Sequence, residues 1–267
     1  MIGPQLPTHL KRKREQKQND DDDDDDEEQQ PAPKRFKLND QMNKLIHPRN
    51  IYRYNKPNFH QLSLKYDVFK EAVKQNSKTG DYYINYNDSK SNVLLTKVLL
   101  KDDFGLEFQH PINHLCPPIT QRLNYILWIQ DLLQCITINS NKKKYHGFDI
   151  GIGASAIFPL LGIKIGEKQN ELWSFIASDI NSESIKYAKH NVEINNLNDK
   201  IKIIHQTNNK QIFKGIFDEN NNKEILIDFT VCNPPFFEHL QETGLNKKRS
   251  NNATKSFKLF RNRIIWR

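Results

Sequence analysis

The sequence contains little cysteine and no long apolar run. Its three cysteines, Cys116, Cys135 and Cys232, have spacings that fit neither a disulfide framework nor a metal site. No apolar run approaches the roughly 20 residues of a membrane span, and the first residues lack the apolar core of a secretory signal. We therefore expect a soluble protein in a reducing, intracellular compartment, with no membrane partner and no metal.

Apolar residues are also nearly absent from residues 1–40, where "KRKREQKQNDDDDDDDEEQQPAPKRFK" contains an unbroken acidic run. A segment with so little to bury is predicted to be disordered. Basic clusters at residues 11–14 and 34–37 flank the acidic run, a pattern typical of a bipartite nuclear-import signal. It predicts a nuclear location, with the cytoplasm as a second one, and an import receptor as a partner. A charge-balanced solvating tail is the alternative.

The remaining chain is strongly basic. Residues 1–40 hold eight basic and eleven acidic side chains, which leaves 32 basic and 21 acidic ones, a net charge of +11, for residues 41–267. Such a surface favours a polyanion, of which nucleic acid is the usual one. A lysine-rich solvated surface is the alternative explanation.

Residues 41–117 have the pattern of a small, mostly helical module. The spacing of Leu62, Tyr66, Phe69 and Val73 predicts an amphipathic helix. The alternation in "DYYINY" predicts a strand, and Ser91 is expected to cap a helix over "SNVLLTKVLLKDDFG".

The loop that precedes these elements interleaves cations with aromatic rings. Its cations are Arg49, Arg53 and Lys56, and its rings include Tyr52 and Tyr54. Phosphate-binding cations beside stacking rings are used by RNA-binding surfaces. We therefore expect residues 41–117 to form an RNA-binding module, although tyrosines in such a loop also occur as ordinary core or surface residues.

Residues 118–267 alternate helices with apolar strands. "PPITQRLNYILWIQDLLQCI" predicts a long helix with one apolar face, made by Ile119, Leu123, Ile126, Leu127 and Leu133. Strands are then predicted in "GFDIG", "LWSFIASD", "KIKIIHQ" and residues 225–232, with helices after the first two. This alternation indicates an α/β fold with a parallel sheet.

Glycine and acidic residues follow the first two of these strands. Asp149, Gly151 and Gly153 close the first strand, and glycines there allow a sharp turn and a close approach to a ligand. Asp179 closes the second strand, a position at which dinucleotide folds bind ribose hydroxyls.

The fourth strand ends in Asn233, Pro234 and Pro235. Two prolines cannot continue a sheet, because each lacks the backbone NH that a ladder needs. The Asn233 amide is therefore expected to project from the carboxyl end of the sheet, where α/β folds bind ligands. By itself the motif also fits a simple strand terminator.

Together these features resemble class I S-adenosyl-L-methionine-dependent methyltransferases that act on exocyclic amines. "RLNYILWIQDLL", "FDIGIGASAIFPLLG" and "VCNPPFF", in this order, resemble more narrowly the methyltransferase-10 family. That family includes U6 small nuclear RNA adenine-N6 methyltransferases and bacterial large-subunit ribosomal RNA relatives. The resemblance implies a Rossmann-like sheet, S-adenosylmethionine as cofactor, and structured RNA, such as U6 or ribosomal RNA, as partner.

The resemblance also implies the site residues. The catalytic residues would be Asn233, Pro234, Pro235 and Phe236. The cofactor-binding residues would be Arg122, Asp149, Gly151, Gly153, Ser155, Asp179 and Asn233. The Asn233 oxygen and the Pro234 carbonyl would accept the two hydrogens of the amine, and Phe236 or Phe237 would stack on the extruded base.

Family members continue the sheet beyond the Asn-Pro-Pro-Phe motif, whereas residues 238–267 contain none of the strands expected there. We therefore expect a methyltransferase domain, residues 118–267, that is incomplete at its carboxyl end. An inactive RNA-binding remnant is one alternative. Guanine-N2 ribosomal RNA and glutamine-N5 protein methyltransferases are others, although Phe236 and the basic module favour nucleic acid.

Overall fold

The structure of the protein, a computed structural model, describes residues 45–112, 114–140, 142–208, 212–216 and 226–234. These residues all belong to the second of two compact units, Gln41–Arg267. The predicted tail at residues 1–40 and its import signal lie outside them. In the described part of the chain, every helix is too short or too polar to cross a bilayer.

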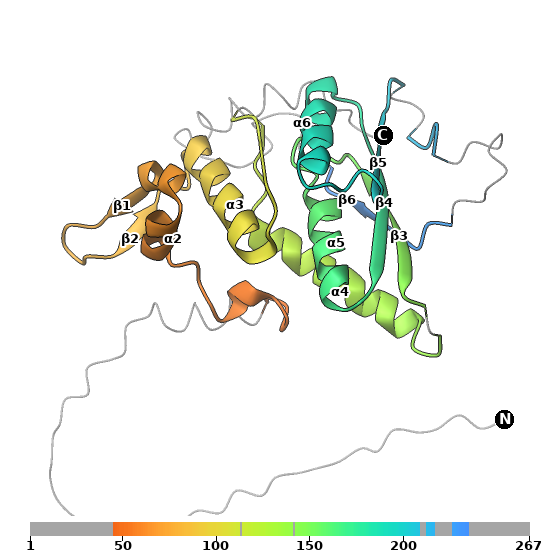
Figure 1. The fold of residues 1–267 in the computed structure, drawn as a ribbon, viewed down its shortest axis with the longest axis horizontal. Helices are drawn as coiled ribbons and strands as arrows, with labels where there is room; N and C mark the ends of the chain where they lie inside the picture. The colour runs from red at the N-terminus through yellow and green to blue at the C-terminus, as the bar shows by residue number, and fades with distance from the viewer. Residues whose placement is uncertain (1–44, 113, 141, 209–211, 217–225, 235–267) are drawn as a thin grey trace, which may run out of the picture. The chain divides into compact units, whose positions relative to one another are not determined.

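The main sheet contains β3 (Lys144–Ile150), β4 (Leu172–Asp179), β5 (Ile201–His205) and β6 (Phe229–Cys232). The strands are parallel and have the order β5-β4-β3-β6 (Figure 1). The chain thus moves outward from β3 to β5 and returns to the other side of β3 with β6. Open α/β sheets bind ligands at such a reversal, which here lies between β3 and β6. The predicted α/β fold is confirmed.

The fourth strand is shorter than the predicted residues 225–232. It begins at Phe229. Just before it, Oδ2 of Asp228 accepts a hydrogen bond from the backbone NH of His146 at 2.8 Å, so this NH does not bond to a backbone carbonyl of the fourth strand. Lys142 forms an ion pair with the same carboxylate. Residue 225 lies outside the described residues.

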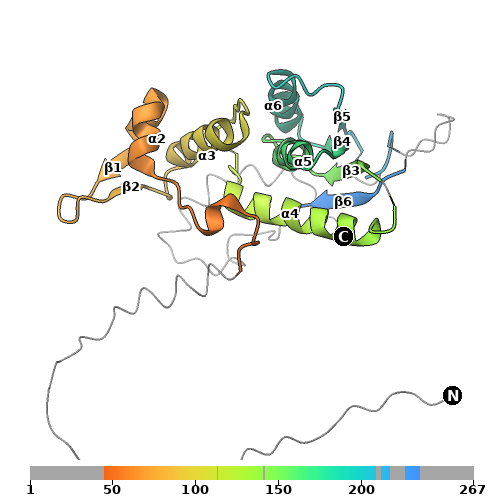
Figure 2. The ribbon, with the colours of Figure 1, turned by 60° about the horizontal axis from the view of Figure 1, so that its bottom comes forward.

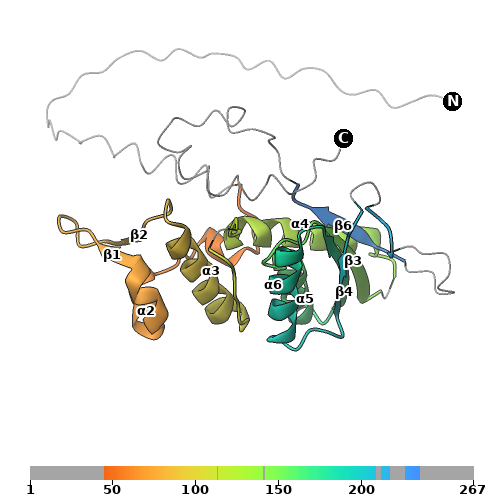
Figure 3. The ribbon, with the colours of Figure 1, turned by 90° about the horizontal axis from the view of Figure 1, so that it is seen from above.

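Three helices accompany the sheet: α4 (Ile119–Ile136), α5 (Ile157–Lys168) and α6 (Ser182–Glu193). Helices α5 and α6 lie side by side along one face of the sheet (Figures 1 and 3), and α4 packs against α5. The apolar face predicted for α4 is buried, with at most 5% of any of its residues exposed: Ile119, Leu123, Ile126, Leu127 and Leu133.

Apart from α3, the amino-terminal elements are short (Figure 2). They are η1 (Ile51–Arg53), α2 (Phe59–Lys65), η2 (Asp67–Ala72), β1 (Val73–Gln75), β2 (Tyr82–Ile84) and α3 (Ser89–Phe104). The predicted strand is β2, which forms an antiparallel hairpin with β1. One hydrophobic core includes residues of these elements and of the main sheet. The domain boundaries at 40/41 and 117/118 stay predictions.

The single helix predicted from Leu62 to Val73 is wrong. Helix α2 ends at Lys65, and Tyr66 is extended (φ −127°, ψ 101°) before the 3-10 helix η2 begins. The Tyr66 hydroxyl donates to Asp102 of α3 at 3.0 Å, and Lys65 forms an ion pair with the same carboxylate. These contacts to α3 accompany the break, and Phe69 is still fully buried because η2 turns it inward.

The predicted cap of α3 is also shifted. Asp88, not Ser91, is the N-cap, and its carboxylate accepts from the backbone NH of Ser91 at 2.9 Å and from the Ser91 hydroxyl at 2.6 Å. An ionised carboxylate suits this position because it also opposes the positive end of the helix dipole. Ser91 contributes as a donor within the first turn.

Two glycines of α5 make room for the aromatic residues that hold this helix on the sheet. A Cβ at Gly162 would lie 2.6 Å from Cζ of Phe175, and one at Gly166 would lie 2.5 Å from Cδ1 of Trp173. The Phe175 ring is itself fixed by an edge contact with Phe229, at 5.6 Å between centroids. It therefore cannot move aside freely. Because α5 follows the loop that closes β3, this packing also sets the position of that loop.

Replacing Gly162 by alanine should therefore destabilise the fold. Overpacking lowers the stability of a fold by about 1 to 3 kcal/mol, and the better helix propensity of alanine raises it by about 1 kcal/mol. We expect urea unfolding to show a free energy of unfolding lower by up to about 2 kcal/mol. The substitution Phe175→Leu should lower the free energy of unfolding less in the Gly162→Ala protein than in the parental chain. A Gly162→Ala protein more stable than the parent would contradict this packing.

Candidate active site

The loop after β3, residues 151–156, has a backbone that only a few residues adopt. The angle φ is 77° at Gly151, 64° at Gly153 and 51° at Ala156. Backbone NH groups of Gly151 and Ile152 both donate to the Ser178 carbonyl, at 2.8 and 3.0 Å. Ala156 is the N-cap of α5, and no side chain caps this helix. The first NH groups of α5 are thus available beside the predicted cofactor loop, which also contains the buried Ser155.

Asp179, at the end of β4, ties this loop to the neighbouring strand. Its Oδ2 accepts from the backbone NH of Gly153 at 2.8 Å, and its Oδ1 accepts from that of Asn181 at 2.9 Å. A carboxylate oxygen can accept more than one hydrogen bond. The predicted contact with ribose hydroxyls therefore remains compatible with this arrangement, and it stays a prediction.

Asp149, near the end of β3, is a buried acid. It is 1% exposed, and neither carboxylate oxygen has a hydrogen-bond partner among the described residues. Burial raises the pKa of Asp149 well above its usual range, the charge of Asp179 raises it further, and Arg122 lowers it. A buried carboxyl without a donor is costly. It is therefore suited to a ligand that brings a cation or a donor.

Arg122 of α4 and Asn233 meet at the same edge. Nη1 of Arg122 donates to Oδ1 of Asn233 at 3.4 Å, and the guanidinium lies over the Phe158 ring, 5.4 Å from its centroid. Burial lowers the pKa of Arg122, while Asp149 opposes that shift. The sequence-predicted residues Arg122, Asp149 and Asn233 are thus brought together although they come from different elements.

The other predicted catalytic residues are only partly described. Pro234 follows Asn233 and is half-buried, whereas Pro235 and Phe236 lie outside the described residues. Among the described residues, no group of three or more histidine, cysteine, aspartate or glutamate side chains is arranged to hold a metal ion.

The sequence analysis missed Asn191 of α6 and Asn195, which follows the end of this helix. Asn191 pairs with the backbone of Gln109, accepting from its NH at 2.8 Å and donating to its carbonyl at 2.9 Å. Asn195 pairs in the same way with Glu107, at 2.8 Å for both bonds. The Asn191 amide also donates to the Ala154 carbonyl in the cofactor loop at 3.1 Å. Only their spacing of four residues, which places both on one side of the helix predicted after the second strand, indicated such a role.

The three predicted RNA-binding cations differ in their surroundings. Arg49 donates to Gln130 at 2.6 Å and forms an ion pair with Asp131, so its guanidinium is held against α4. Arg53 donates to the Ile46 carbonyl at 2.8 Å and lies over the Tyr54 ring. In the described part of the chain, the exposed Lys56 has no side-chain partner.

This fold and site define a class of protein. A parallel sheet with reversed strand order, a glycine loop after its first strand, an acid after its second and Asn-Pro-Pro after its fourth are those of a Rossmann-like methyltransferase domain. The model of the methyltransferase-10 family, described as an RNA methyltransferase family, matches residues 40–262. The chain belongs to this family.

Curated relatives support the same assignment. A U6 small nuclear RNA (adenine-(43)-N(6))-methyltransferase of Dictyostelium discoideum is 38% identical over 79% of this chain and 40% of its own length. The human RNA N(6)-adenosine-methyltransferase METTL16 is 37% identical over 78% of this chain and 35% of its own length. The chain therefore spans about two fifths of the length of these relatives.

Solved structures agree with the fold. The human METTL16 catalytic domain in complex with the MAT2A 3'UTR hairpin 1 has a TM-score of 0.63 and 37% identity, over 77% of this chain and 65% of that one. The N-terminal domain of human METTL16 in complex with SAH has a TM-score of 0.60 and 35% identity, over 74% of this chain and 75% of that one.

The Asn191 contacts generate a prediction with a matched control. Asn191→Ala removes the side-chain hydrogen bonds to Gln109 and Ala154, whereas Asn195→Ala removes those to Glu107 and to the Asn191 carbonyl and leaves the Ala154 contact in place. We expect Asn191→Ala to weaken binding of S-adenosylhomocysteine about tenfold, or about 1.4 kcal/mol, because the loop at residues 151–156 loses a fixed anchor. Asn195→Ala should bind it within about twofold of the parent.

Calorimetry at a temperature where both variants are folded measures this difference, and circular dichroism checks the folding. Equal affinities of the two variants would show that the Ala154 contact does not position the cofactor loop.

Proposed function

We propose that this chain is the methyltransferase domain of an S-adenosylmethionine-dependent RNA adenine-N6 methyltransferase. The observation that carries the proposal is the Asn233 amide, held by Arg122 at the carboxyl edge of the sheet and followed by Pro234. Membership of an RNA methyltransferase family, and relatives named as adenine-N6 methyltransferases, support it.

The residues at the edge fit the cofactor. The Asp149 carboxyl lacks any donor among the described residues and would accept from a cationic ammonium group. Arg122 would pair with a carboxylate, and Asp179 with ribose hydroxyls. The loop that contains Gly151, Gly153 and Ser155 would lie against the ligand. When bound, S-adenosylmethionine supplies an activated methyl group on a sulfonium, so the protein need not form a covalent intermediate.

Asn233 and Pro234 address the weakness of the nucleophile. The exocyclic nitrogen of adenine attacks poorly because its lone pair is delocalised into the ring. If the Asn233 oxygen and the Pro234 carbonyl each accept one amine hydrogen, the nitrogen is oriented and its pyramidal form is favoured. The Arg122 contact, at 3.4 Å, uses one lone pair of the Asn233 oxygen and leaves the other for the amine. Stacking of the base on Phe236 stays part of the proposal.

The substrate proposal rests on charge and on the relatives. Residues 41–267 carry a net charge of +11, and the solved relative was crystallised with an RNA hairpin. Because Arg49 is already paired with Asp131, we assign RNA phosphate contacts to Arg53 and Lys56 and give Arg49 the role of holding the loop on α4. U6 small nuclear RNA is the proposed substrate, and the import signal predicted at residues 1–40 agrees with a nuclear location.

The experiment that tests the proposal is methyl transfer to a U6 small nuclear RNA transcript, followed by nucleoside analysis. Asn233→Ala should lower the rate of N6-methyladenosine formation by two to three orders of magnitude, about 3 to 4 kcal/mol, because it removes a preorganised acceptor. RNA affinity, measured by fluorescence anisotropy, should change little.

Asn233→Asp is the matched control, since it keeps an acceptor oxygen with almost the same shape. It should retain more activity than Asn233→Ala. Full activity of Asn233→Ala would remove Asn233 from the mechanism. A parental chain that binds S-adenosylhomocysteine but methylates no structured RNA would overturn the proposed function.

The raised pKa of Asp149 predicts a pH dependence of cofactor binding. In the ligand-free protein burial favours the protonated carboxyl, whereas a bound cation favours the carboxylate, so binding releases a proton. Affinity is then lost as the pH falls below the ligand-free pKa. The logarithm of the affinity should rise with pH by up to about one unit per pH unit and level off above that pKa.

Calorimetry with S-adenosylhomocysteine between about pH 5 and pH 8, above the ordinary aspartate range, measures this slope. Asp149→Asn should bind more weakly and with little dependence on pH. An equally steep slope in Asp149→Asn would assign the proton to another group.

A further inference from the structure

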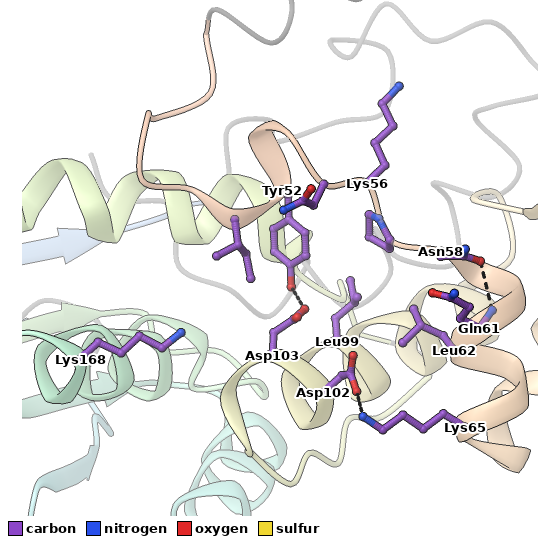
Figure 4. Close-up of a pocket in the computed structure, with 13 residues that line it drawn as sticks. Tyr52, Lys56, Asn58, Gln61, Leu62, Lys65, Leu99, Asp102, Asp103 and Lys168 are labelled. Carbon is purple, nitrogen blue, oxygen red and sulfur yellow. Dashed lines mark hydrogen bonds and ion pairs between the residues drawn. The ribbon is translucent and has the colours of Figure 1, made fainter.

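A cavity lies apart from the sheet edge that is proposed for methyl transfer. It has a volume of about 640 Å³ and is lined by the segment after η1, by α2 and α3, and by Lys168 at the end of α5 (Figure 4). Helix α5 rises about 1.5 Å per residue, so Lys168 lies roughly 17 Å from the loop at residues 151–156. A ligand in this cavity would therefore not be the adenine that accepts the methyl group.

Three lysines surround the cavity, and two of them are not paired with an acid. Lys65 forms an ion pair with Asp102, and this pair is drawn in Figure 4. Among the described residues, Lys56 has no partner. Lys168 forms no ion pair, but it lies over the Phe104 ring, 4.9 Å from its centroid, and its charge opposes the rise that burial causes in the pKa of Asp103. Figure 4 shows Lys168 extending from α5 toward Asp103. Lys168 is thus available to a phosphate group in the cavity, and Lys56, which Figure 4 shows directed away from Asp103, is available to a neighbouring phosphate.

The floor of the cavity offers acceptors instead of cations. Asp103 accepts from the Tyr52 hydroxyl at 2.6 Å, and Asp102 accepts from Tyr66 in addition to Lys65. Carboxylates have further acceptor positions when two bonds are made. They can accept hydrogen bonds from the hydroxyl groups of a ligand. A ligand with both phosphate and hydroxyl groups satisfies the lysines and the acids together.

The walls suit a planar ring with polar edges. Leu62 and Leu99 are buried beneath the cavity, at 7% and 5% exposure. The amides of Asn55 and Gln61 line it and make no side-chain hydrogen bond among the described residues. Amide groups pair with the edges of bases, and single-stranded RNA is read by bases splayed into such sites.

We propose that this cavity binds one ribonucleotide of the substrate RNA, at a position other than the methylated adenine. Lys168 contacts the phosphate of this nucleotide, and Lys56 contacts a neighbouring phosphate. Asp102 or Asp103 accepts from the 2′-hydroxyl, and the amides of Asn55 and Gln61 contact the base edge. The inference rests on the proposed function, because it takes the substrate to be RNA. It adds a contact between the methyltransferase helix α5 and the RNA held by the amino-terminal module.

The test compares two lysines of α5. Lys168→Met removes the charge of a cavity lysine but keeps an apolar stem against Phe104. Lys164→Met removes an equal charge one turn away, at a lysine that pairs with Glu167 and does not line the cavity. Lys168→Met should weaken binding of a U6 transcript about three- to tenfold and flatten the log-affinity against log-salt line by about 0.7 to 0.9. Lys164→Met should leave both nearly unchanged.

The 2′-hydroxyl contact is tested with transcripts that carry one 2′-deoxynucleotide at each position in turn. One position outside the methylated adenine should weaken binding to the parental chain, and Asp103→Asn should reduce that loss. Affinity for S-adenosylhomocysteine should stay at the parental value in Lys168→Met. Free adenosine monophosphate serves as the second probe, and we expect it to bind the parental chain far more weakly than RNA does.

Outcomes that overturn the inference are distinct from those that overturn the proposed function. If the parental chain methylates RNA while Lys168→Met and Lys164→Met bind it equally, the cavity is not an RNA subsite and the proposed function stands. If Lys168→Met weakens binding of adenosine monophosphate but leaves RNA affinity unchanged, the ligand is a free nucleotide and the RNA subsite is wrong. A parental chain that binds no RNA overturns both.

Discussion

Parallel register at one edge of the main sheet is the constraint on which the site depends. Ile150 of β3 pairs with Ser178 on one side and with Cys232 on the other. Because parallel strands place their carboxyl ends at the same edge, the residues at these ends are adjacent in space although they are separated along the chain. Asp179 and Asn233 therefore flank Asp149, and Arg122 of α4 completes the group.

The charged groups at this edge destabilise the ligand-free protein. Asp149 is buried with no donor among the described residues, and the charge of Asp179 disfavours its ionisation further. Arg122 compensates only in part, and burial lowers its own pKa. Groups that a fold leaves unsatisfied in this way are typical of functional sites, because a ligand supplies the missing partner. The aromatic packing of α5 and the Asn191 amide keep the adjacent loop in place, so that the ligand need not order it.

Polar contacts join the amino-terminal elements to the methyltransferase sheet. Arg49 bonds to Gln130, which in turn donates to the buried Glu171 at 2.7 Å, so a chain of three side chains runs from the amino-terminal loop through α4 to the start of β4. Asn191 and Asn195 bind the segment after α3 to α6 and to the turn that follows it. With a common hydrophobic core, these contacts hold the surface proposed for RNA at a fixed distance from the cofactor loop, which a positioned reaction requires.

The sequence by itself determined the elements of the main sheet, the long helix α4 and the residue types at the strand ends, because apolar periodicity and strand-ending glycine and proline act over a few residues. It did not determine the break at Tyr66, whose hydroxyl bonds to Asp102, 36 residues away. Nor did it identify Asn191, which pairs with Gln109 across 82 residues, or the engagement of Arg49 with Gln130 across 81. The local sequence pattern identifies the side chains that are proposed to carry the chemistry. Only tertiary packing decides which of their donors and acceptors are already used, because partners so far apart in the chain meet only in the folded protein.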